Sequence, residues 1–172
     1  ADKAPDIRGF AFKVQKVSGR SALDGKSTSV QDFLLINHTT FSAARAEEFL
    51  DLLLALAKGG GAVLKHLMKA HGFFGMFAAM ARFAKVIGKK FTSYLSENFS
   101  TVLPVKNGDY AMKLRIRPLS PQLGEPNKAD ITADVRKVLK STPAEYAVEL
   151  QFYTDADLTP IENASIEWPE SE

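Results

Sequence analysis

Residues 31–49, QDFLLINHTTFSAARAEEF, decide the fold, because they join a strand to the first helix through a short polar turn. The apolar residues just before Asn37 predict a strand covered on both faces. Asn37 and the residues up to Thr40 predict a turn that ends it. Thr40 or Ser42 is expected to cap a helix over residues 43–57, whose apolar residues recur at helical spacing.

The stretch before this segment predicts the partner strand of a hairpin. In residues 8–17, RGFAFKVQKV, the side chains of Phe10, Phe12 and Val14 alternate with Ala11 and Lys13. Period two is typical of a half-buried strand. The polar, glycine-containing residues 18–29 predict the turn between the two strands.

Residues 62–87 predict a second helical stretch, with breaks near Gly72 and Gly75. It is apolar almost all round and includes Phe73, Phe74 and Phe77. A helix of this kind is usually buried in a core or in a subunit contact. A lid over a lipid-like substrate is the less favoured interpretation.

The second half of the chain predicts two more strands and a short helix. In residues 110–117, Met112, Leu114 and Ile116 are expected to face inward, and Lys113, Arg115 and Arg117 outward. Residues 129–140 predict an amphipathic helix, and residues 145–154 a last alternating strand. This order indicates an α+β fold, an antiparallel β-barrel with inserted helices. We expect one domain over residues 1–172, with a helical insertion at about residues 43–90.

Composition excludes several classes of function. The net charge of +2 gives no reason to expect nucleic acid as a partner. Residues 52–96 carry seven Lys or Arg and no acid, whereas the chain from residue 122 onward carries eleven acids and four bases. Two differently charged faces of one domain explain this best, and a membrane surface is not expected as a partner. The absence of cysteine excludes disulfides, a thiolate nucleophile and Cys-ligated metal.

Several motifs together resemble the catalases, and most closely the small catalase-related haem peroxidases. Residues 8–13, RGFAFK, are similar to a haem-side strand of that family, and two phenylalanines follow the Asn-containing turn at the family's spacing. Further along, an Ala-x-Lys strand ends in Arg-Pro, and the C-terminal part contains Pro-Ile-Glu and then Glu-Trp-Pro. The residues in question are Gly9, Phe41, Phe49, Ala111, Lys113, Arg117, Pro118, Pro160, Ile161, Glu162, Glu167, Trp168 and Pro169.

The resemblance implies a catalase-like β-barrel that binds haem and breaks down hydrogen peroxide or organic hydroperoxides. It places the haem against four residues, namely Gly9, Leu34, Phe41 and Phe49. It also implies peroxide-side roles for Asn37, as a hydrogen-bond donor, and for His38, as a base or an iron ligand. In an alignment to the family without gaps, the catalytic asparagine falls on Ile36. Asn37 takes that role only if the alignment is shifted by one residue. The competing interpretation of Asn37 is a turn residue.

Two residues that define the family's iron site have no counterpart in this sequence. No histidine precedes Arg8, and none of the four tyrosines has arginine four positions before it, as the family's tyrosinate ligand has. The resemblance therefore leaves an alternative, a haem-less barrel that binds an apolar ligand or another protein near Phe73. We expect a homo-oligomer, or association with flanking segments. His66 and His71 would lie about 140° apart on a helix, so no metal site is predicted.

Overall fold

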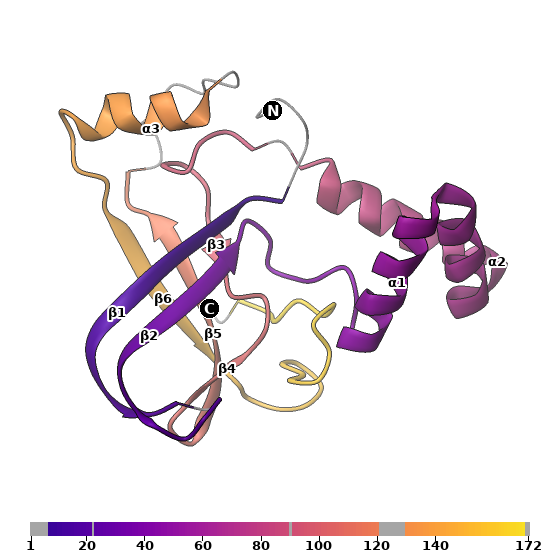
Figure 1. The fold of residues 1–172 in the computed structure, drawn as a ribbon, viewed down its shortest axis with the longest axis horizontal. Coiled ribbons are helices and arrows are strands. Elements are labelled where there is room, and N and C mark those ends of the chain that lie inside the picture. The colour runs from indigo at the N-terminus through magenta and orange to yellow at the C-terminus, as the bar shows by residue number, and fades with distance from the viewer. Residues whose placement is uncertain (1–6, 22, 90, 121–129, 171–172) are drawn as a thin grey trace.

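The structure is a computed structural model that describes residues 7–21, 23–89, 91–120 and 130–170 (Figure 1). It is an α+β fold in which six antiparallel strands form one curled sheet, a half-barrel, accompanied by three helices. The strands are β1 (Gly9–Arg20), β2 (Ser27–Ile36), β3 (Phe99–Ser100), β4 (Val105–Asn107), β5 (Tyr110–Pro118) and β6 (Tyr146–Phe152); the helices are α1 (Ala46–Lys58), α2 (Gly60–Ile87) and α3 (Ile131–Leu139).

The predicted hairpin is present and sets the register of the sheet. β1 and β2 pair so that Gly9 lies opposite Ile36 and Phe10 opposite Leu35. β2 then continues through β3 to β5, which pairs on its other side with β6. The two-residue β3 and three-residue β4 are not predicted by the sequence analysis, because segments that short carry no readable periodicity.

The core lies on one face of this sheet and is mainly aromatic. Leu35, Phe99, Leu114 and Ile116 are its buried centre. Rings from distant segments pack around Phe99, and its ring lies 5.3 Å from that of Phe10 and 5.6 Å from that of Tyr94, between centroids. Such aromatic pairs stabilise the fold beyond the area they bury. The strands are therefore held together where β1, β3 and β5 meet.

The opposite face of β5 and β6 is covered by the C-terminal segment, residues 153–170. The backbone N–H of Phe41 donates to the carbonyl of Ala164, and the N–H of Ala164 donates to the carbonyl of Ala44. The segment is thereby tied to the chain that follows β2. It also covers Lys113, which is only 6% exposed. The expectation that Lys113 faces solvent is therefore wrong, because a segment far along the chain covers its face of the strand.

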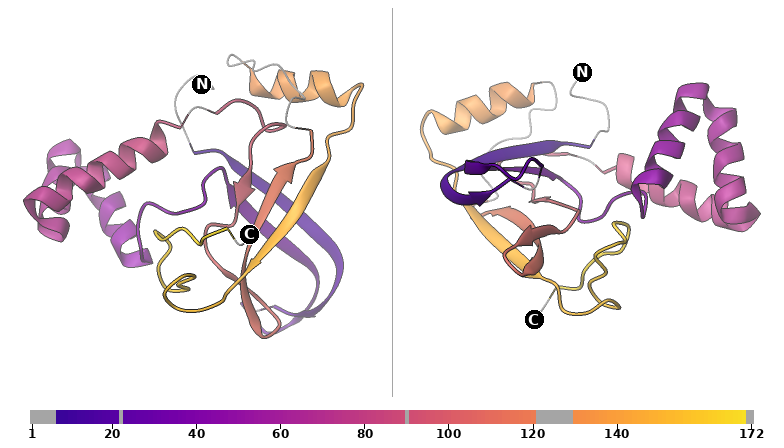
Figure 2. Two further views of the ribbon diagram at one scale, coloured as in Figure 1. Left: turned by 180° about the vertical axis from the view of Figure 1, so that it is seen from behind. Right: turned by 60° about the horizontal axis from the view of Figure 1, so that its bottom comes forward.

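Helices α1 and α2 form an arm that extends away from the sheet (Figure 2). They pack mainly against each other. α2 bends at Gly72, as predicted, where φ is 69° and ψ is 177°. Arg45 occupies the N-cap of α1 without a side-chain hydrogen bond, so the expected cap by Thr40 or Ser42 is wrong.

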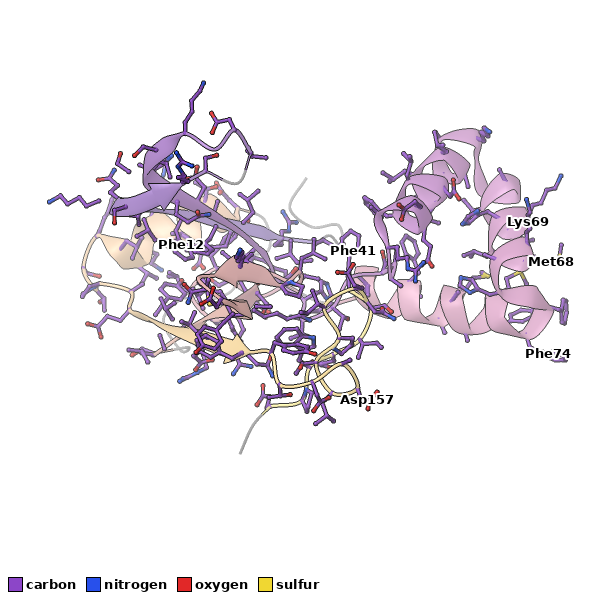
Figure 3. The ribbon with its side chains drawn as sticks, turned by 90° about the horizontal axis from the view of Figure 1, so that it is seen from below. Phe12, Phe41, Met68, Lys69, Phe74 and Asp157 are labelled. Carbon is purple, nitrogen blue, oxygen red and sulfur yellow. The ribbon has the colours of Figure 1, made fainter. Side chains whose placement is uncertain are left out.

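Apolar side chains of the arm are exposed rather than buried. Phe74 is 85% exposed, and it lies with Met68 and Lys69 at the far end of the arm (Figure 3). Phe73 and Phe77 are more than half exposed as well. None of the described helices is both long enough and apolar enough to cross a membrane.

Candidate functional site

The residues expected to face haem on the hairpin share one face of β1 and β2. Gly9 lies opposite Ile36, and Ala11 lies opposite Leu34, so these four residues face the side away from the aromatic core. Leu34 is 76% exposed, which corrects the expectation that β2 is covered on both faces. A Cβ on Gly9 would meet only the carbonyl of Leu35, at 3.7 Å. The result is an open apolar surface, here called the hairpin face.

Asn37 follows directly after β2 and is almost fully buried, with 1% of its surface exposed. Its Oδ1 accepts a hydrogen bond from the backbone N–H of Arg8 at 2.9 Å, and its own N–H donates to the carbonyl of Arg8 at 3.0 Å. These bonds give Asn37 a structural role at the end of the hairpin. Its Nδ2 has no hydrogen-bond partner among the described residues, which leaves one buried donor available.

His38 also has an available polar atom. Its Nε2 is buried without a hydrogen-bond partner among the described residues. Burial, followed by the nearby positive charge of Lys89, lowers the pKa of His38, while Glu97 and a hydrogen bond with the backbone of Val86 act in the opposite direction. Burial and the charge of Lys89 therefore favour the neutral imidazole, in which one ring nitrogen carries a lone pair.

Lys89 connects this turn to the chain that follows α2. Its Nζ donates to the backbone carbonyl of Asn37 at 2.7 Å and lies 3.1 Å from a carboxylate oxygen of Glu97. The turn that carries Asn37 and His38 is therefore held from two sides, by Arg8 and by Lys89. A held turn keeps its side chains in one geometry, as a binding or catalytic group requires.

Phe41 and Phe49 contact each other, with ring centroids 4.7 Å apart in an edge-on arrangement. They pack together at the start of the arm. The other four expected site residues lie at one end of the hairpin, namely Gly9, Leu34, Asn37 and His38. Among the described residues, no hydrogen bond or ring contact joins the phenylalanine pair to the hairpin face.

Two of the four tyrosines, Tyr94 and Tyr146, pack against the core. Tyr146 donates its hydroxyl to the backbone carbonyl of Tyr94 at 2.8 Å, and burial raises the pKa of Tyr146. The ring of Tyr94 stacks on Phe99 in the core. Among the described residues, no three His, Asp or Glu side chains come close enough to hold a metal ion.

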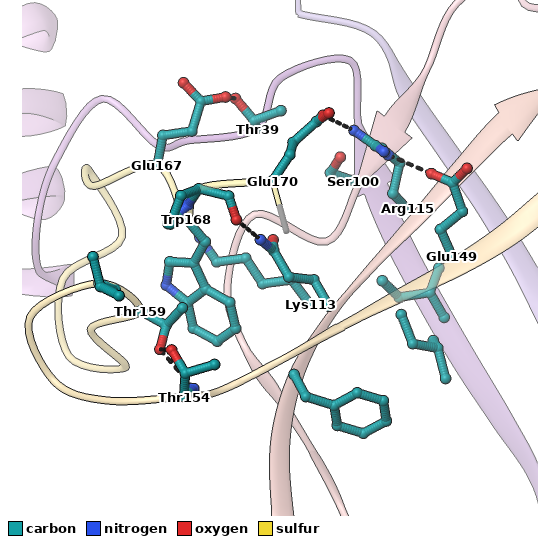
Figure 4. A pocket seen from close by; sticks show the side chains of 16 residues that line it. Thr39, Ser100, Lys113, Arg115, Glu149, Thr154, Thr159, Glu167, Trp168 and Glu170 are labelled. Atoms are coloured by element: carbon teal, nitrogen blue, oxygen red, sulfur yellow. Dashed lines mark hydrogen bonds and ion pairs between the residues drawn. The ribbon is translucent and has the colours of Figure 1, made fainter. Parts of the chain in front are cut away.

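A second site, which the sequence analysis misses, lies under the C-terminal segment. Here a cavity of about 580 Å³ opens between that segment and strands β5 and β6 (Figure 4). This volume is within the range of small-molecule sites. Lys113 lies inside, with its Nζ 4.8 Å from the ring centroid of Trp168, a cation–π contact. We call this the Lys113 cavity.

Most charged groups around the Lys113 cavity are paired. Arg115 contacts both Glu149 and Glu170, and Arg117 also donates to Glu149. The carboxylate of Glu149 is thus shared by two guanidinium groups, whose hydrogen bonds and charges lower its pKa. Glu167 accepts a 2.7 Å hydrogen bond from the hydroxyl of Thr39.

Lys113 is the exception. Its Nζ is buried and makes no hydrogen bond to any described residue. Burial lowers the pKa of Lys113, and the charge of Glu167 only partly opposes this. In the sequence, the only indication of this site is that the Ala-x-Lys and Glu-Trp-Pro motifs both belong to the family resemblance. Periodicity alone points Lys113 to solvent.

Comparison with known protein families gives no match for this chain, and comparison with curated proteins gives no significant match either.

Proposed function

We propose that this chain is related to the catalase-related haem hydroperoxidases and that its half-barrel is the counterpart of their β-barrel. The observation that carries the proposal is the pair of unsatisfied buried atoms in the turn that follows the hairpin, Asn37 Nδ2 and His38 Nε2. Buried polar atoms normally have partners, so two neighbouring exceptions mark a place for a ligand. The motifs from Arg8 to Trp168 support the proposed family.

The residues of the hairpin face fit one side of a haem. Gly9 leaves room for a flat ring above the backbone, and the exposed side chain of Leu34 offers apolar contact. The haem would supply the redox chemistry of hydroperoxide cleavage. Asn37 would donate a hydrogen bond to the hydroperoxide, and neutral His38 would accept its proton at Nε2. Tyr94 and Tyr146 are engaged in the core, and His38 is the alternative candidate for an iron ligand.

A hemin titration tests this proposal at the hairpin face. The wild-type protein should show a saturable Soret band with one hemin bound per chain. Gly9→Val should weaken binding at least tenfold, because its side chain would occupy the space of the ring. Gly19→Val is the matched control on the same strand, where a Cβ also meets nothing close. Equal affinity for hemin in both variants, or no saturable band in the wild type, would refute the proposal.

A second candidate function is a contact surface on the arm, favoured by the exposure of Phe73, Phe74 and Phe77. Exposed apolar patches of this kind mark interaction sites. A second copy of this chain is the occupant that the charges favour. Lys58, Lys65 and Lys69 are exposed on the part of the arm from Leu52 onward, which contains no acidic residue. The C-terminal segment exposes five carboxylates, on Asp155, Asp157, Glu162, Glu167 and Glu170.

Sedimentation velocity over a range of protein concentrations tests this second candidate. The wild type should self-associate, and Phe74→Ser and Lys69→Glu should each raise the dissociation constant at least tenfold. Leu23→Ser and Lys106→Glu are the matched controls, since both residues are exposed and lie outside the arm. A wild type that stays monomeric yet binds vesicles of anionic phospholipid would refute self-association and assign the arm to a lipid surface.

A further inference from the structure

The Lys113 cavity contains a buried cation whose hydrogen bonds are missing. An ammonium group has three donors and no acceptor. In a folded interior each buried charge is normally paired, because an unpaired one costs several kcal/mol of desolvation. The ring of Trp168 at 4.8 Å offsets part of this cost but accepts no conventional hydrogen bond. The missing component is therefore an acceptor.

The other polar groups of the cavity wall do not supply it. Gln151 donates to the carbonyl of Pro169, and the hydroxyls of Thr154 and Thr159 lie within hydrogen-bond distance of each other. Glu149 and Glu170 are bound to Arg115. Among the described residues, Glu167 is the one charge that opposes the lowered pKa of Lys113. Its carboxylate accepts a hydrogen bond from the hydroxyl of Thr39 and forms no ion pair with Lys113 within this part of the chain.

We infer that the Lys113 cavity binds a small carboxylate, whose oxygens accept hydrogen bonds from Lys113 Nζ. A carboxylate supplies negative charge and acceptor atoms together, which is what the ammonium group lacks. The cavity of about 580 Å³ leaves room for more than the carboxylate itself, and the Trp168 ring forms an apolar wall for the remainder of the molecule. This site needs no haem and does not depend on the proposed function.

Trp168 provides the readout, since it is the only tryptophan in the chain and it contacts Lys113. Its fluorescence should change saturably when the full chain is titrated with acetate or succinate at constant ionic strength. Lys113→Gln should lose this response, while Lys106→Gln, altered at an exposed site on β4, should keep it. Inorganic phosphate is the third probe and should bind more weakly than succinate.

A variant at Glu167 distinguishes ligand binding from a simple internal ion pair between Glu167 and Lys113. If a carboxylate ligand competes with the charge of Glu167, then Glu167→Gln should bind succinate at least threefold more tightly. If the partner of Lys113 is instead Glu167 itself, then Glu167→Gln should not bind succinate more tightly, and the wild type should give no saturable fluorescence response. That result, or an identical response in Lys113→Gln, would overturn the inference. If Lys113→Gln does not fold, the binding of succinate by Lys113→Arg and Glu167→Gln still tests the inference.

Discussion

At the scale of single residues, three buried atoms carry the functional argument: Asn37 Nδ2, His38 Nε2 and Lys113 Nζ. All three lie in residues whose surroundings come from other parts of the chain. Arg8 and Lys89 surround the turn of Asn37, and the C-terminal segment covers Lys113. If an unsatisfied buried group is retained for binding at a cost in stability, replacing that group should make the folded protein more stable.

Lys113→Met should therefore stabilise the protein. The change replaces an unpaired buried ammonium with an apolar side chain of similar length, and we expect the free energy of unfolding to rise by about 1 kcal/mol. Urea denaturation measures it. Lys106→Met, at an exposed position, should stay within about 0.5 kcal/mol of the wild type. A loss of stability in Lys113→Met would mean that Lys113 is satisfied in the folded protein.

His38 should make stability depend on pH below neutrality. Its pKa is lowered in the folded state by burial and by Lys89, whereas in the unfolded chain it titrates near about 6.5. The unfolded state therefore binds the proton first. The contribution of His38 to stability is complete above about pH 6.5 and is lost as the pH falls toward the folded pKa. In urea denaturation from pH 7.5 to 5, His38→Gln should lose less stability than the wild type, and His71→Gln, an exposed histidine, should match the wild type.

At the scale of elements, the hairpin can be predicted from the sequence, whereas the arm can be predicted only in part. Alternation in residues 8–17 predicts β1, because every second side chain joins one core. The break at Gly72 is predicted because glycine interrupts helices. The exposure of Phe74 is not predicted, because periodicity shows only that a helix is apolar. It does not show whether a neighbour covers that helix.

The bend of α2 gives a prediction at this scale. At φ 69° and ψ 177° Gly72 occupies a region that other residues enter only with strain. Gly72→Ala should lower the thermal stability of the arm by about 1–3 kcal/mol, or straighten α2. Gly61→Ala, inside the same helix with open space around it, should instead raise stability by about 0.5–1 kcal/mol. Amide hydrogen exchange across residues 60–87 distinguishes these results, and equal effects of the two changes would contradict the account.

At the scale of the whole molecule, the open face of the hairpin and the Lys113 cavity lie on the same side of the sheet. Ile36 pairs with Ser100, and Ser100 pairs with Arg115, so this side runs without interruption from β2 to β5. The sequence predicts the curled antiparallel sheet through its strand order. It does not predict the cavity, because that requires residues 153–170 to return across strands that precede them. The turn at Asn37 could be located from its residue types, whereas its hydrogen bonds to Arg8 could not.

The arm matters for any haem experiment, because exposed apolar side chains such as Phe74 offer hemin a second apolar surface to bind. A Soret band alone does not locate the binding site. The measurement that tests the central claim most directly is therefore amide hydrogen exchange of the full chain with and without one equivalent of hemin. We expect slower exchange in residues 8–12 and 33–38, with residues 70–80 unchanged. Protection confined to residues 70–80 would contradict the claim that the hairpin face is the haem site.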